Sequence, residues 1–215
     1  TILSSIIDSS EVAKHLPKKV IKLANQFWFY SPPKDAHPYS DYRNDIEQYF
    51  DLTGGHLEYY PASAFQTPVL TLLQTVPQEA VDFVLSFTNR SIEYFSKSEL
   101  GNEAEEIDVV IDDSGTTVKQ YIGHRIWNIY RGTQVAPPLL ESVHMALEKW
   151  LLTVAKTWDP EVVEKWCLYL MKNSRSASIT AIVASTVLAE PSKLFSVAKV
   201  LFRNKDFFFF DSALN

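Results

Sequence analysis

The sequence contains a single cysteine, Cys167, and this scarcity limits the chemistry of the protein. One thiol cannot form an internal disulfide, and zinc sites built from several cysteines are excluded. Such low cysteine use is typical of proteins in a reducing compartment, so we expect a cytoplasmic location. Because Cys167 stands between Trp166 and Leu168, and buried thiols are usually inert, we predict that it lies in the core.

Positive charge and long apolar runs are also scarce. The 215 residues include 20 Lys and Arg against 26 Asp and Glu, a formal net charge of -6, so the chain lacks the overall basic field that attracts nucleic-acid phosphates. Its most apolar window, residues 177–189, is shorter than the roughly 20 residues that a membrane-spanning helix needs. No basic, apolar leader opens the sequence. We therefore expect no membrane partner.

Motifs of common enzyme sites are missing as well, including the phosphate-binding loop, the dinucleotide fingerprint and the G-x-S-x-G elbow. Glu141, His144 and Glu148 have the spacing of metal ligands on one helix face, but a two-metal site needs a second such motif, so a polar helix face is the simpler interpretation. His56 and Glu58 suggest an acid and a base without a nucleophile, and we interpret them as part of a turn. We expect no cofactor and no metal.

Helical periodicity with short connections is what the sequence does contain. Because the connections are only a few residues long, consecutive helices must fold back antiparallel. This predicts a mainly α protein, an antiparallel helix stack of the α-solenoid or HEAT-like kind, without a strict sequence repeat. The expected helices are two short ones meeting near Pro17 after an N-cap at Ser10, amphipathic turns over residues 42–50, and then 62–74, 77–95, 138–158, 160–171, 176–189 and one starting at Pro191.

One segment departs from this periodicity. Ile107, Val109 and Ile111 alternate with polar residues before the turn-forming residues 112–115, which predicts an inserted β-hairpin that can extend through residues 126–130. The chain is thus divided into an N-terminal helical part (1–98), an acidic loop and hairpin (99–132) and a C-terminal helical stack (133–215), together one continuous domain. The carboxylates Asp108, Asp112 and Asp113 lack the order of a calcium-binding loop, so we interpret them as a solvated acidic arm.

Aromatic and basic residues interleave at the end of the hairpin. Such residues can stack on bases and hold phosphates, so this group is the predicted binding site, although the adjoining acidic run opposes nucleic acid. The alternative is that its aromatic side chains anchor the hairpin onto the helices. The group consists of Tyr121, Arg125, Trp127, Tyr130 and Arg131.

A family resemblance covers the C-terminal part, from Tyr121 through Asp211. The segments WNIYRG (127–132), MALEKWLL (145–152), NS (173–174) and AIVAS (181–185) follow one another along it. This succession resembles helical regions of large multi-domain bacterial ATP-binding proteins associated with phage defence. The resemblance implies an arm that senses or scaffolds, with the nucleotide-binding core elsewhere in a longer protein, and it assigns no site residue.

Two features at the ends of the sequence predict that it is a piece of a longer protein: the absent initiator Met and the four consecutive phenylalanines 207–210. The leading functional prediction is a non-enzymatic helical interaction, scaffold or sensor module that binds another protein or another domain of the same chain. Nucleic-acid contact through the hairpin and a metal-dependent enzyme using Glu141, His144 and Glu148 are the alternatives.

Overall fold

The computed structural model describes residues 2–4, 6–29, 46–53, 58–112 and 114–212. They form ten α-helices, three short 3₁₀ helices and one two-stranded β-hairpin, so the expected mainly α class is confirmed. The α-helices are α1 (Ile6–His15), α2 (Pro17–Phe27), α3 (Val69–Thr75), α4 (Pro77–Phe95), α5 (His124–Asn128), α6 (Pro138–Thr157), α7 (Pro160–Asn173), α8 (Ala177–Ala189), α9 (Phe195–Phe202) and α10 (Lys205–Ser212). The 3₁₀ helices are η1 (Ile46–Phe50), η2 (Gly101–Glu103) and η3 (Ile129–Arg131), and the strands are β1 (Glu105–Val110) and β2 (Thr117–Ile122).

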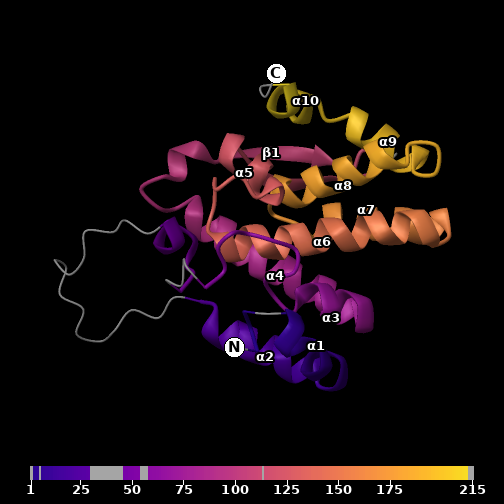
Figure 1. Cartoon of the computed structure of the whole chain (residues 1–215). Helices are drawn as coiled ribbons and strands as arrows, with labels where there is room; N and C mark the ends of the chain where they lie inside the picture. The colour runs from indigo at the N-terminus through magenta and orange to yellow at the C-terminus, as the bar shows by residue number, and fades with distance from the viewer. Residues whose placement is uncertain (1, 5, 30–45, 54–57, 113, 213–215) are drawn as a thin grey trace.

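The helices build a stack of successive layers, as predicted (Figure 1). α1 and α2 contact α3 and α4, α3 and α4 contact α6 and α7, and α6 and α7 contact α8 and α9. α10 follows α9 at the end of the stack that lies opposite α1 and α2 (Figure 1). No helix among the described residues is both long and apolar enough to cross a membrane.

Proline and short polar side chains start the helices where the sequence predicts. Pro77, Pro138 and Pro160 occupy the first turn of α4, α6 and α7, where the missing N–H costs no hydrogen bond. Asp159 caps α7, because its carboxylate accepts a hydrogen bond from Glu161 N at 2.9 Å. Ser176 caps α8 in the same way. These local signals explain why α6, α7 and α8 start within one residue of the expected positions.

Three predicted helix starts are wrong. Residues 62–68 are not helical, and α3 begins only after Pro68, because Ser142 Oγ of α6 holds Ser63 N at 3.1 Å and proline lacks a donor. Ser10 lies inside α1, whose packing on α3 overrides the weak helix preference of serine. Pro191 lies in a turn in which Leu194 N donates to Glu190 O, so α9 starts four residues later than expected.

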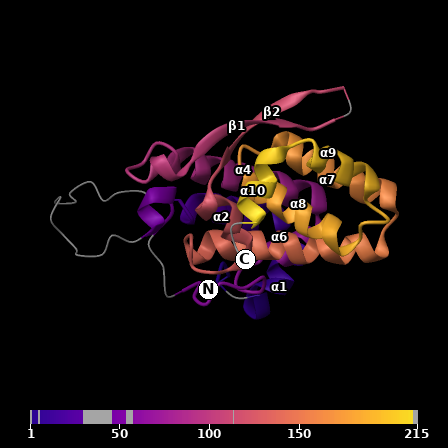
Figure 2. The ribbon, with the colours of Figure 1, turned by 90° about the horizontal axis from the view of Figure 1, so that it is seen from above.

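The hairpin is confirmed, but its extension to residue 130 is wrong. β1 pairs antiparallel with β2 from Glu105 opposite Ile122 to Val110 opposite Thr117. The residues before Glu105 form η2, so no strand faces the chain beyond Ile122, and the chain turns at Gly123 into α5. Seen from above, the hairpin lies along one edge of the stack (Figure 2).

One buried side chain fastens the hairpin to the last layer of the stack. Asn204, between α9 and α10, accepts a hydrogen bond from Val110 N at 2.7 Å and donates to Val110 O at 2.9 Å. It also donates to Val200 O at 3.0 Å. On the other strand, Tyr121 N donates to Arg175 O at 2.8 Å. Both edges of the hairpin therefore contact the C-terminal helices.

Candidate interaction surface

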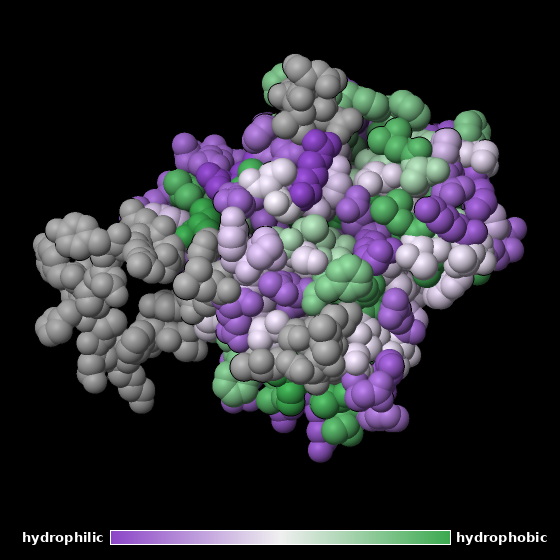
Figure 3. All heavy atoms as spheres, in the orientation of Figure 1, coloured by the Kyte–Doolittle hydropathy of each residue, from purple (hydrophilic) through white to green (hydrophobic). Residues whose placement is uncertain are grey.

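A cluster of exposed hydrophobic side chains covers the C-terminal end of the stack. Five of the thirteen exposed large hydrophobic residues in the described part of the chain lie here, among them the four most exposed. Figure 3 shows hydrophobic side chains gathered over α9 and α10. We call this cluster the C-terminal surface: Leu188 (73% exposed), Phe195 (65%), Phe202 (70%), Phe208 (46%) and Phe209 (70%).

Two of these side chains, Phe195 and Phe202, remain exposed because they lie on the outer face of the short helix α9. One of its faces, with Val197 and Leu201, is buried in the stack. Phe195, Lys199 and Phe202 follow at i, i+4 and i+7, and all three are exposed. A helix that is apolar around its whole circumference normally has partners on every side. Among the described residues only Phe208 of α10, which stacks on Phe202, covers part of the outer side of α9, and Phe195 and Phe202 stay 65% and 70% exposed.

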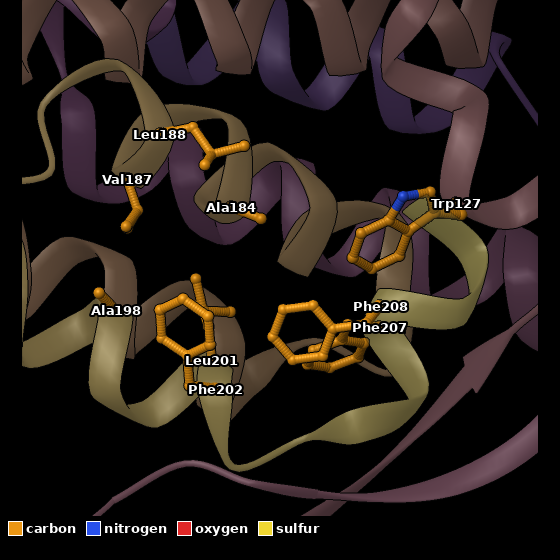
Figure 4. A pocket seen from close by; sticks show the side chains of 9 residues that line it. All are labelled: Trp127, Ala184, Val187, Leu188, Ala198, Leu201, Phe202, Phe207 and Phe208. Carbon is orange, nitrogen blue, oxygen red and sulfur yellow. The ribbon is translucent and has the colours of Figure 1, made fainter. Parts of the chain in front are cut away.

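An apolar pocket opens into this surface (Figure 4). α8 lines one side of it, α9 and α10 line the other, and Trp127 lies at one end (Figure 4). Its volume is about 120 Å³, comparable with the roughly 150 Å³ of an apolar cavity that holds a benzene molecule. The pocket therefore has room for one apolar side chain. The lining residues are Trp127, Ala184, Val187, Leu188, Ala198, Leu201, Phe202, Phe207 and Phe208.

Aromatic stacking gives the pocket its shape. The Phe207 ring stacks on Trp127 with the centroids 5.4 Å apart, and the Phe208 ring stacks on Phe202 at the same distance. Trp127 and Phe207 are buried, whereas Phe202 and Phe208 are exposed. Because α5, α9 and α10 each contribute a ring, the pocket exists only when these three helices are packed together.

Cations predominate in the sequence that carries the apolar residues, between Glu190 and Asp206. The segment from residue 193 to residue 205 contains four cations and no acidic residue, in a chain of net charge -6. Lys193 pairs with Glu190 at 3.4 Å, and Arg203 donates to the backbone oxygen of Asp112 at 2.9 Å. Lys199 and Lys205 are exposed and form no ion pair with any described side chain. Lys199 lies over the Phe195 ring, 5.5 Å from its centroid.

The predicted binding residues at the end of the hairpin do not share one exposed face. Trp127 is buried against α10, so it cannot stack on a nucleobase, whereas Tyr130 and Arg131 lie in η3, where Arg131 Nε donates to Tyr130 Oη at 3.1 Å. Tyr121 lies in β2, with the Arg175 guanidinium 5.8 Å from its ring centroid.

Arg125, the remaining member of that group, is engaged within the protein. Its Nε donates to Glu103 Oε2 at 2.7 Å, and its Nη1 donates to Val135 O. The neighbouring cation Lys119 pairs with Glu106 at 2.6 Å. The two ion pairs neutralise Arg125 and Lys119. The bond from Arg125 to Val135 O also joins the hairpin region to the loop before α6.

The candidate metal ligand His144 is fully buried between α6 and α8. Because a carbonyl can only accept, Nδ1–H donates to Leu140 O at 2.8 Å, and Nε2 then accepts from Ser178 Oγ at 2.8 Å. Ser178 in turn accepts from Ser176 Oγ at 2.7 Å. Burial lowers the pKa of His144 to about 4, so the ring is neutral. Nδ1 therefore bonds within α6, and Nε2 joins α6 to α8.

The carboxylates beside His144 also form internal hydrogen bonds. Burial raises the pKa of Glu141 to about 7, and its Oε1 accepts from Val135 N at 2.9 Å and Ala136 N at 3.2 Å. Glu148 accepts from Ser185 Oγ at 2.6 Å. In the part of the chain that the structure describes, no three His, Cys, Asp or Glu side chains lie close enough together to hold a metal ion.

The remaining candidates are the pair His56 and Glu58, the acidic residues Asp112 and Asp113, and Cys167. His56 and the glycines before it lie outside the described residues, and Glu58 is exposed. Asp113 is likewise outside, while Asp112 accepts hydrogen bonds from Ser114 and Thr116 that lower its pKa to about 2 and close the hairpin turn. Cys167 is buried as predicted, and burial raises its pKa to about 12.

Helical periodicity alone does not reveal the C-terminal surface, because Phe195 and Phe202 are as apolar as Val197 and Leu201 of the same helix. The available signal was that these two pairs fall on different faces of one short helix. Comparison with known protein families and with curated proteins finds no match to the chain.

Proposed function

We propose that the chain is a non-enzymatic helical interaction module, of the scaffold or sensor type, and that it binds a partner protein through the C-terminal surface. The observation that carries this proposal is the amount of exposed aromatic surface. An aromatic side chain buries about 150–250 Å² when it is fully covered. At the exposed fractions given above, the four phenylalanines leave roughly 500 Å² in water, which is the size of the largest apolar patch on a typical monomeric protein, about 300–600 Å², and such patches are often functional.

The internal roles of the polar candidates favour binding over catalysis. His144, Glu141 and Glu148 each form hydrogen bonds that join α6 to α8 or to the loop before α6. Arg125 serves the hairpin region in the same manner. The resemblance of residues 121–211 to helical regions of large multi-domain bacterial ATP-binding proteins associated with phage defence implies the same role, sensing or scaffolding.

Photo-crosslinking in the cells that encode the protein tests this proposal. A photoreactive phenylalanine derivative at position 202 should give one discrete adduct with another protein, because this side chain borders the pocket. The matched control places the same residue at Tyr94 on α4, an exposed aromatic residue (46%) far from the pocket. Adducts of equal pattern at both positions, or none at position 202, would refute the proposal.

A further inference from the structure

We infer that the occupant of the C-terminal surface is an amphipathic helix of another protein, which places one apolar side chain in the pocket and acidic side chains beside Lys199 and Lys205. This inference rests on the proposed function and specifies the partner. Four observations support it: the arrangement of the stack, the size of the pocket, the charge around it and the charge at the opposite end of the molecule.

The stack itself indicates that the occupant is a helix. α3 is covered by α6, α6 by α8, and α8 by α9, so every earlier layer presents its outer face to the next helix (Figure 1). The outer face of α9 carries Phe195, Lys199 and Phe202 at i, i+4 and i+7. Side chains at this spacing lie on one face of a helix, as in the stripe through which two helices pack together. A further helix on α9 repeats the contact that the protein already makes three times.

The pocket indicates how the occupant is held in register. With about 120 Å³ between α8 and α10, it accepts a single side chain of the size of leucine or phenylalanine. Binding of a helix in a groove commonly depends on a few apolar anchors at i, i+3, i+4 and i+7. When one side chain of the bound helix fills the pocket, the apolar side chains one turn before and after it contact Phe202 and Phe208 at the pocket rim.

The charge around the surface selects an acidic partner. Lys199 and Lys205 are exposed on either side of Phe202 in the sequence and have no carboxylate partner among the described side chains. Acidic residues one turn from the apolar anchor can reach these ammonium groups, whereas basic residues there are repelled. Lys199 already contacts the Phe195 ring, which keeps its charge close to the apolar surface.

The same charge argues against a second copy of this chain as the occupant. In a symmetric contact the C-terminal surface faces a copy of itself, which brings the lysines of the two copies, Lys199 and Lys205 of each, to the same interface. The opposite end of the stack, at α1 and α2, exposes Leu16 (48%) and Phe27 (57%) but is also basic. Its exposed cations are Lys14 and Lys18, which pair with Glu11 and Glu79, and Lys19 and Lys22, which form no ion pair with any described side chain. Head-to-tail stacking of copies therefore brings two basic surfaces together as well.

An anionic membrane also attracts apolar and basic surfaces. A lipid leaflet is broad and flat, however, and the exposed Phe202 and Phe208 border a hollow between α8 on one side and α9 and α10 on the other (Figure 4). The helix leaves no such void when its anchor fills the pocket. We therefore favour the helix, and vesicles enter the experiment as a competing binder.

The test uses two labelled 18-residue helical peptides with the same leucine stripe at i, i+4, i+7 and i+11. The polar positions flanking the stripe are Glu in one peptide and Lys in the other. Fluorescence anisotropy with the full chain should show that the acidic peptide binds about tenfold more tightly at low salt, as expected from two partly exposed ion pairs. This preference should shrink at high salt. The double variant Lys199→Glu/Lys205→Glu should reverse it.

A matched control is the double variant Lys165→Glu/Lys172→Glu, which makes the same change in net charge on the exposed side of α7. It should keep the preference for the acidic peptide. Equal binding of the two peptides, preference for the basic one, no binding of either, or tighter binding to phosphatidylserine vesicles would overturn the inference. If position 202 still crosslinks to a protein, the proposed function stands without it, whereas loss of that crosslink removes the proposed function itself.

Discussion

Replacing Glu141 by glutamine should make the stability of the protein depend on pH between 5 and 7, a range in which the unaltered protein should respond little. The reason is that Glu141 and His144, one turn apart on α6, are both buried and have pKa values displaced in opposite directions. Burial raises the pKa of Glu141 from 4.5 to about 7 and lowers that of His144 from 6.5 to about 4. Each group thus favours its neutral form in the folded protein.

The two groups affect stability with opposite signs. Between pH 5 and 7, His144 stays neutral in the folded chain but takes up a proton in the unfolded chain as the pH falls, so its contribution is complete above pH 6.5 and declines toward pH 4. Glu141 keeps its proton in the folded chain while the unfolded chain has lost it, so its contribution is complete below pH 4.5 and declines as the pH rises through 7.

The two effects are similar in size. One pKa unit corresponds to about 1.36 kcal/mol. Lowering the pH from 7 to 5 therefore costs roughly 2 kcal/mol through His144 and gains roughly 2 kcal/mol through Glu141. In the Glu141→Gln variant only the loss of stability from His144 remains when the pH falls. In the reciprocal His144→Gln variant only the gain of stability from Glu141 remains.

Urea unfolding at pH 5, 6 and 7 measures both effects. Each variant is compared with itself across pH, so the constant cost of the substitution cancels. We expect the free energy of unfolding to fall by about 2 kcal/mol from pH 7 to pH 5 in Glu141→Gln and to rise by about the same amount in His144→Gln. If both variants keep the pH dependence of the unaltered protein, neither group has the displaced pKa, and the reasoning from burial is wrong.

Three further predictions concern single contacts. Asn204→Ala removes three hydrogen bonds and should lower the free energy of unfolding in urea by about 2–3 kcal/mol, whereas the exposed Asn102→Ala should change it by less than about 0.5 kcal/mol. Gly123→Ala places a Cβ 2.0 Å from Glu103 O. The resulting strain should lower the melting temperature by several degrees in calorimetry. An unchanged melting temperature contradicts this close approach. Cys167 should react with a thiol reagent only as fast as the protein opens, and a rate equal to that of a free thiol would show that it is not buried.

Local chemistry explains the part of the fold that was predictable. Pro77, Pro138 and Pro160 mark helix starts because the first helical turn does not need their missing donor. The turn at Asp112 identifies the hairpin, because its side chain bonds the backbone two and four residues further on. Each of these signals lies within a few residues of the structure that it determines.

Contacts between distant residues explain the part that was not predictable. The C-terminal surface exists because Val197 and Leu201 pack inward while Phe195 and Phe202 stay exposed, and these residues are equally apolar in the sequence. Likewise, nothing in the local sequence relates Asn204 to Val110, 94 residues away. The burial of a helix face depends on which helix arrives opposite it, and periodicity alone does not contain that information.

The link that Asn204 makes between the hairpin and the end of the stack bears on how the molecule comes apart. In a stack in which each layer contacts only its neighbours, the end layer can unfold first while the other layers stay folded. Here the hairpin precedes α5 and α6 in the sequence, yet it bonds the residue between α9 and α10. Unfolding of α9 and α10 therefore also breaks the hydrogen bonds between Asn204 and β1. We expect the outermost layer and the hairpin to unfold as one cooperative unit.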